Sequence, residues 1–188
     1  GESKSFLLIG AGAGGGSSLY EDCVANSNAA ALKGTNGEAT YISIDGTTIA
    51  FTAGGGKAGV GGVDGGSGQY INGVAGDGGQ WTVAGEYTSA TRTNGQAGNA
   101  TGANHKGAKT DSSGRGAGGD GADGYITATQ GFGGGAGEGA RLSIIYTNNT
   151  ANTQYARLYV GGGGKGEQSL LTEGEDGTVV TPENYIVG

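Results

Sequence analysis

The glycines Gly10, Gly12 and Gly15 follow an apolar run at residues 6–9 and match the pattern G-x-G-x-x-G. In dinucleotide-binding proteins this pattern forms the turn between a strand and a helix, where the backbone approaches the pyrophosphate. Such a unit also needs repeated alternation of strands and helices, and a carboxylate that ends the second strand. Hairpin patterns and glycine runs follow here instead, and Asp45 is expected in a turn. The pattern therefore does not predict a nucleotide site, and we expect these glycines to begin a glycine-rich helix.

The other side chains that could do chemistry form no catalytic or metal-binding pattern. His105 is the only histidine and Cys23 the only cysteine, whereas a nucleophile needs a base beside it and a metal needs several converging ligands. Asp120 and Asp123 lie in G-G-D-G-A-D-G, which lacks the large apolar residues of calcium-binding glycine repeats. We expect these carboxylates in turns or on the surface. We predict no catalytic residues, no metal and no cofactor, and a protein that is not an enzyme.

The composition restricts the kind of structure that the chain can form. Glycine accounts for 47 of 188 residues, or 25%, against a usual level of about 7%. The single proline, Pro182, excludes a collagen triple helix. The net charge of −7 argues against nucleic acid as a partner, and no apolar run is long enough for insertion into a membrane. Because large apolar residues are few, the chain is either disordered or held together by something other than a large core.

Short apolar and β-branched runs predict strands. Residues 41–44 and 47–51 flank Asp45-Gly46, a dipeptide favoured in two-residue hairpin turns. In that register Ile42 would lie opposite Ile49. The other predicted strands are residues 6–9, the pair 141–146 and 155–160, and the pair 178–180 and 185–187 with Pro182 in its turn. Residues 17–32 are a candidate for a short helix.

Glycine recurs at every third position in several stretches. The longest stretch is Gly56, Gly59, Gly62, Gly65 and Gly68, and the step repeats within residues 73–79, 118–124 and 131–137. A period of three matches an extended helix of the polyproline II type, which has three residues per turn and no internal hydrogen bonds. Glycine at each third position would let such helices approach closely and exchange backbone hydrogen bonds. A flexible linker is the alternative, but linkers lack the Ile, Val and Tyr that interrupt these runs.

The predicted fold class is mainly irregular and β: a bundle of packed polyglycine II helices with small antiparallel β-hairpins and little α-helix. We expect a single glycine-rich domain over residues 1–188. Within it, residues 1–53 form a base that contains a hairpin, and residues 54–140 form the polyglycine II bundle with its loops. Residues 141–188 form a second hairpin and a C-terminal segment.

Two stretches, residues 80–94 and 101–113, are polar and lack regular spacing. Aromatic side chains on loops offer a large contact area at a small entropic cost, although they could equally pack a thin core. The candidate binding residues are Tyr70, Trp81, Tyr87, Arg92, Asn104, His105 and Lys106.

The stretches G-R-G-A-G-G-D-G-A-D-G (residues 114–124) and Y-T-N-N-T-A-N-T-Q-Y-A-R-L-Y-V-G-G-G-G-K-G (residues 146–166) resemble the glycine-rich tip domains of bacteriophage tail fibres, including the distal adhesins of T-even-type phages. The resemblance covers about residues 54–166. It implies a scaffold of polyglycine II helices that carries variable loops, here residues 80–94 and 101–113. It further implies an outer-membrane protein or lipopolysaccharide glycan of a host bacterium as receptor, and the tail fibre shaft protein as partner. The location would be the distal tip of the fibre on the virion, as a homotrimer or as a monomer.

Two other functions are compatible with a glycine-helix bundle. Ice binding requires a flat face of regularly spaced small or Thr side chains, but Thr88, Thr91 and Thr93 cluster in a predicted loop. A self-assembling extracellular filament protein would pair through open strand edges at residues 6–9 or 178–187.

Overall fold

The computed structural model describes residues 1–16, 34–45, 48–60, 63–66, 69–71, 73–83, 89–99, 106–110, 113–121, 134–166 and 178–180. The strands in this part are β1 (Ser3–Ile9), β2 (Thr40–Ile44), β3 (Thr48–Ala53), β4 (Val63–Gly66), β5 (Gln69–Ile71), β6 (Trp81–Val83), β7 (Ser89–Thr93), β8 (Arg141–Thr147), β9 (Ala156–Tyr159) and β10 (Thr178–Val180). No helix occurs among the described residues. The prediction of a mainly β protein is confirmed.

The strands form two four-stranded sheets and one separate pair, and all the pairings are antiparallel. The first sheet has the order β10-β1-β8-β7 and the second the order β6-β3-β2-β9, while β4 pairs with β5. Apart from the β2–β3 hairpin, neighbours within each large sheet are distant in the sequence, so the sheets bring together segments from the whole chain. From here on, we use the name base for the two large sheets together, which include strands beyond the predicted residues 1–53.

The base contains the main apolar core. Side chains of β1 and β8 alternate between buried and more exposed positions, as expected for strands with one covered face. Phe6 and Leu8 of β1 cluster with Leu142 of β8, and with Ile42 and Phe51 of the second sheet. The two sheets therefore pack against each other through their inner faces.

The hairpin of β2 and β3 forms, but its predicted register is wrong. Ile42 lies opposite Phe51 rather than Ile49, and the register shifts between Ile42 and Ser43. Ile44 pairs with Thr48, so residues 45–47 connect the strands, and Asp45 has a φ of 51°. The irregularity places Ile42 and Phe51 in the same core cluster, a gain that turn chemistry alone does not reveal.

The predicted pairing of residues 141–146 with residues 155–160 is also wrong. Strand β8 pairs with β1 and β7, whereas β9 pairs with β2 in the other sheet. The intervening turn thus carries the chain from one sheet to the other. Strand β8 buries Leu142 and Ile144 in this way, while Ala156 and Leu158 of β9 are half-buried against the same core. A two-stranded hairpin could not cover these side chains alone.

Strand β1 is an inner strand. It lies between β8 and β10, so the expectation that residues 6–9 offer an open edge is wrong. Residues 178–180 do form a strand, β10, but it pairs with β1. Residues 185–187, Pro182 and the candidate helix at residues 17–32 lie outside the described residues.

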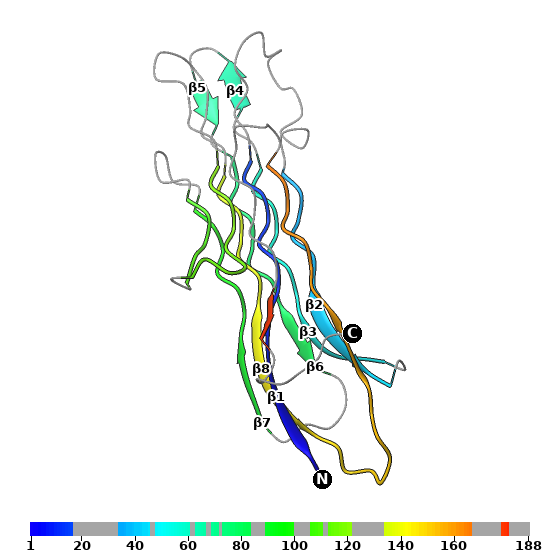
Figure 1. Cartoon of the computed structure of the whole chain (residues 1–188). Helices are drawn as coiled ribbons and strands as arrows, with labels where there is room; N and C mark the ends of the chain where they lie inside the picture. Colours follow the sequence, from blue (N-terminus) through cyan, green and yellow to red (C-terminus); the bar gives the residue numbers. More distant parts are fainter. Residues whose placement is uncertain are drawn as a thin grey trace.

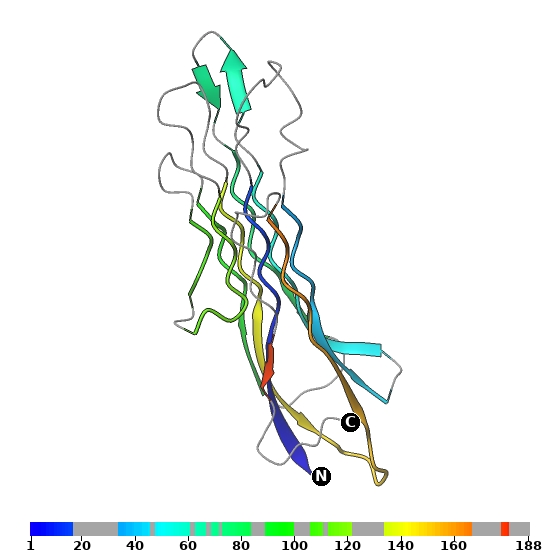
Figure 2. The ribbon, with the colours of Figure 1, turned by 45° about the horizontal axis from the view of Figure 1, so that its top comes forward.

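Glycine-rich segments extend from the base and run side by side along the molecule (Figures 1 and 2). They continue the strands directly, as residues 10–16 follow β1 and residues 134–140 precede β8. We call them the array, and its segments are residues 10–16, 34–39, 54–60, 73–80, 94–99, 106–110, 116–121, 134–140 and 161–166. The β4–β5 pair lies at the far end, opposite Gly1, and we call this the distal end.

Segment 134–140 shows how the array is bonded. Its N–H groups donate to three neighbouring segments in turn, so that every third residue donates to the same neighbour. The pairs toward segment 54–60 are Gly134 to Val60, Gly137 to Lys57 and Ala140 to Gly54, at 2.8–2.9 Å. The residues between them donate to segments 94–99 and 116–121.

The carbonyl groups of the same segment accept from a different set of neighbours. Segment 10–16 donates to it through Gly10, Ala13 and Gly16, again at a step of three. Segments 73–80 and 106–110 donate to it as well. Six segments therefore bond to this one, three as acceptors and three as donors. All of its N–H groups are paired with neighbouring segments in this way, without an α-helix or a sheet.

Glycine is required where these backbones meet. A Cβ atom at Gly137 would overlap the carbonyl group of Asp77, and one at Gly139 would overlap the carbonyl group of Gly10. Gly56 and Gly59, in the three-residue step seen in the sequence, face carbonyl oxygens in the same way. Gly65, by contrast, belongs to strand β4, while Gly62 and Gly68 lie outside the described residues. The small cluster of Ala13, Ala58 and Ala136 is the only apolar cluster among the described residues of the array.

Substitution of Gly137 tests the packing of the array. We expect Gly137→Ala to lower the free energy of unfolding by about 3 kcal/mol or more, because the methyl group meets rigid backbone. Gly162 is the matched control, since the nearest atom to its added Cβ is Glu38 Oε2 at 3.9 Å. Gly162→Ala should leave the stability unchanged or raise it by about 0.5 kcal/mol. Chemical denaturation measures both, and equal stabilities of the two variants would contradict the packing described here.

Candidate functional site

At the distal end, several array segments end beside one another. Their ends are joined by backbone hydrogen bonds: Gly16 N–H to Gly134 O at 2.9 Å, Gly34 N–H to Gly59 O at 3.3 Å, and Asn99 N–H to Lys106 O at 2.9 Å. The array segments that flank residues 17–33, 100–105 and 122–133 therefore have their ends close together at the distal end. We call these hydrogen-bonded segment ends the platform. The β4–β5 pair extends from the same end (Figure 1).

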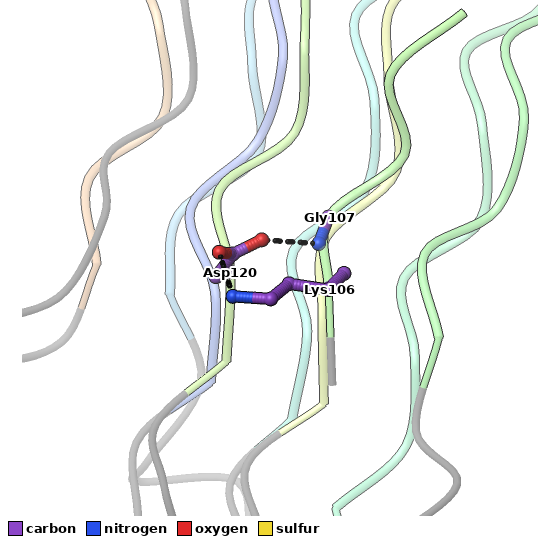
Figure 3. A network of polar contacts seen from close by, with 3 residues as sticks. All are labelled: Lys106, Gly107 and Asp120. Carbon is purple, nitrogen blue, oxygen red and sulfur yellow. Dashed lines mark hydrogen bonds and ion pairs between the residues drawn. The ribbon is translucent and has the colours of Figure 1, made fainter. Parts of the chain in front are cut away.

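Asp120 ties one flank of residues 100–105 to the array (Figure 3). Its carboxylate accepts a hydrogen bond from the backbone N–H of Gly107 at 2.8 Å and forms an ion pair with Lys106 Nζ at 2.8 Å. The Lys106 side chain is 65% exposed, so the pair contributes little to stability. The contact with the backbone stabilises the fold, because it satisfies an N–H group that no carbonyl among the described residues accepts. Asp120 therefore has a structural role on the surface, as its sequence context suggests.

Glu138 ties both flanks of residues 100–105 together. Its carboxylate is buried, at 1% exposure. Glu138 Oε1 accepts the N–H of Gln96 at 3.0 Å, and Oε2 accepts the N–H of Thr110 at 2.9 Å. The Thr110 hydroxyl donates to the same carboxylate. One side chain thus holds segments 94–99 and 106–110 at a fixed separation.

In other array segments, too, side-chain oxygens accept backbone N–H groups. Asn36 Oδ1 accepts the N–H of Ala58, Glu38 Oε2 that of Gly162, and Thr35 Oγ1 that of Lys165. Sequence reasoning missed Glu138 and these residues as organising groups. The available signal was an isolated polar side chain inside a glycine run, such as the glutamate of G-A-G-E-G-A at residues 135–140.

The structure brings Trp81 and Arg92 together. Trp81 lies in β6 and Arg92 in β7, and the guanidinium carbon lies 4.6 Å from the indole centroid. Trp81 also packs partly against the core of the base. Because β6 and β7 belong to the two large sheets, residues 80–94 are not a single loop, and that part of the prediction is wrong. The pair lies in the base, away from Lys106 at the distal end.

The other candidates are distributed as follows. Tyr70 lies in β5 at the distal end. Lys106 begins array segment 106–110, where its carbonyl oxygen accepts the N–H of Asn99. Tyr87, Asn104 and His105 lie outside the described residues. Whether any of these residues binds a receptor stays a prediction.

Exposed tyrosines gather at the edge strand β9, a feature that the sequence did not single out. The rings of Tyr41 and Tyr159 stack with centroids 4.7 Å apart, and Tyr155 is 73% exposed. The Tyr159 hydroxyl donates to Glu38 Oε2 at 3.1 Å. This hydrogen bond to a carboxylate raises the pKa of Tyr159, because it stabilises the protonated phenol. The base therefore presents an aromatic surface of its own.

Within the described residues, no three His, Cys, Asp or Glu side chains lie close enough to hold a metal ion. The same part of the chain contains no helix that could cross a bilayer. Comparison of the chain with protein-family models, with curated proteins and with solved structures found no match.

Replacement of Glu138 tests its role in holding the two flanks. Glu138→Gln keeps the size of the side chain but leaves one acceptor oxygen for two backbone N–H groups, so an amide NH₂ must face a donor. We expect a loss of about 2 kcal/mol in the free energy of unfolding. Glu2→Gln is the control, because the Glu2 side chain is exposed. The melting temperature of this variant should match that of the native protein. Equal melting temperatures for both variants would contradict the assignment.

Proposed function

We propose that this chain is the receptor-binding tip of a bacteriophage tail fibre, an adhesin that contacts the surface of a host bacterium. The observation that supports it best is the array, a rod of backbone-bonded segments several of whose ends are hydrogen-bonded together at the distal end. A scaffold of this kind presents several chain segments on a fixed platform while it leaves their sequences unconstrained. The resemblance of residues 114–124 and 146–166 to phage tip domains supports the same function.

In this proposal the array segments are polyglycine II helices. The step of three in the hydrogen bonds of segment 134–140 supports this, since such a helix has three residues per turn. The backbone angles are compatible with it as well. Among the described residues of the array, only Gly116 has a positive φ angle, and it lies at the start of segment 116–121.

Amide hydrogen exchange tests the helices. The N–H groups of residues 134–140 should exchange slowly, because each is bonded to a neighbouring segment. The amide of the exposed residue Ala151 serves as the fast reference within the same sample. Exchange of residues 134–140 as fast as that of Ala151 would mean that the array is a flexible tether.

The proposed receptor-binding surface is the distal end. Its candidate contacts are Tyr70, Lys106 and residues 100–105 with Asn104 and His105, all close to the platform in the chain. The receptor is an outer-membrane protein or a lipopolysaccharide glycan, and the base faces the fibre shaft. Several copies on one virion would raise the avidity of a weak single contact.

Binding to bacteria tests the function. The chain, fused to a fluorescent protein, is titrated onto a panel of Gram-negative strains with complete and truncated lipopolysaccharide. We expect saturable binding to some strains, which falls by about tenfold or more when residues 100–105 are replaced by a Gly-Ser sequence of equal length. The melting temperature should not change, because Glu138 and Asp120 still hold the flanks.

Tyr155→Ser is the control, since Tyr155 is strongly exposed but lies in the base. It should bind the strains like the native chain. Absence of saturable binding to every strain, or binding that depends on Tyr155 and not on residues 100–105, would refute the proposal. Thermal hysteresis of the purified chain would instead indicate ice binding.

A further inference from the structure

A cleft opens in the base, at the end of the molecule opposite the proposed receptor-binding surface. Its volume is about 390 Å³, within the usual range for pockets that bind small molecules. It lies between the start of β1, the end of β8 and the turn that joins β8 to β9. Every residue that lines it is described by the structure.

One side of the cleft is apolar and rigid. Phe6, which is 3% exposed, and the partly buried Ile44 and Ala156 line it together with the ring of Tyr146. Tyr146 is held from two directions. Its ring meets Phe51 edge-on, with centroids 6.2 Å apart, and its hydroxyl donates to Gln154 Oε1 at 2.7 Å. The aromatic surface is therefore already oriented before any ligand enters.

The other side is a polar turn with a defined shape. Asn148 Oδ1 accepts the N–H of Thr150 at 2.8 Å, and Asn148 Nδ2 donates to the carbonyl oxygen of Asn152 at 2.7 Å. These bonds fix residues 148–152 and leave amide and hydroxyl groups of Asn152 and Thr153 along the rim. Such groups both donate and accept hydrogen bonds.

The cleft carries no net charge from its side chains. Glu2 and Lys4 are its only ionisable side chains apart from tyrosine, and they pair with each other at 2.6 Å. The hydrogen bond from Lys4 lowers the pKa of Glu2, so the carboxylate stays ionised beside the ammonium group at neutral pH. An anionic ligand such as a phosphate would find no unpaired cationic side chain here.

We propose that this cleft binds a neutral saccharide. A sugar ring has apolar C–H faces and hydroxyl groups around its edge, which matches an aromatic and aliphatic wall opposite a rim of amides and hydroxyls. The cleft is too small for a long stretch of polypeptide but accommodates a sugar residue. The inference does not depend on the proposed function, because the cleft and the distal end lie at opposite ends of the molecule.

Saturation-transfer NMR on the whole chain tests the proposal. The probes are neutral methyl glycosides of glucose, galactose, mannose and N-acetylglucosamine at millimolar concentration. We expect transfer to the ring protons of at least one of them. Ala151→Trp, which fills the cleft from its exposed rim, should weaken this binding by about tenfold or more. Gln154→Leu, which removes the polar partner of Tyr146, should weaken it as well.

Val160→Trp is the matched control, since Val160 is 50% exposed and does not line the cleft. Its affinity should stay within about twofold of that of the native chain. The proposal is overturned if no glycoside shows transfer, or if Ala151→Trp binds as tightly as Val160→Trp while both melt at the native temperature. Neither result bears on the attachment to bacteria through residues 100–105, which is measured separately.

Discussion

The structure depends on backbone N–H groups that find their acceptors in other segments of the chain. In the array this is possible only where no Cβ atom separates the backbones, as at Gly137 and Gly139. The large glycine content is thus a packing requirement, although glycine loses more conformational freedom on folding than any other residue. Each segment bonds to several neighbours at once, so the array has to form as a unit, and its stability comes from many short hydrogen bonds rather than from buried apolar area.

The base supplies the large apolar core that the array lacks. Its apolar core, with Leu8, Ile42 and Phe51 among its members, joins two antiparallel sheets, and the strands of these sheets continue directly into array segments. The register of the sheets therefore also sets the register of the glycine segments. Where an outer segment has an N–H group without a carbonyl partner, a side chain such as Glu138 or Asp120 accepts it. These polar residues fix the edges of the rod in the way that caps fix the ends of helices.

The rod separates two chemically different ends. At the distal end, bonded segment ends flank the residues proposed to contact a bacterial receptor, and their flanks are held by Glu138 and Asp120. At the base, the cleft and the exposed Tyr155 and Tyr159, directly before and at the end of β9, offer surfaces that no distal contact would cover. An elongated scaffold with two accessible ends is compatible with attachment at one end and recognition at the other.

The sequence by itself determined the mainly β character, the presence of strands at β1, β2, β3, β8, β9 and β10, and the places where glycine recurs at every third residue. These features follow from the local sequence, because β-strand propensity and the spacing of glycines can both be read from neighbouring residues. The partners of the strands were decided only by the tertiary structure. Ile42 lies opposite Phe51, and β8 pairs with β1, because the inner faces of two sheets must match across a shared core. The pairing of Trp81 with Arg92 and the burial of Glu138 among three segments were equally out of reach, since both depend on contacts between residues far apart in the chain.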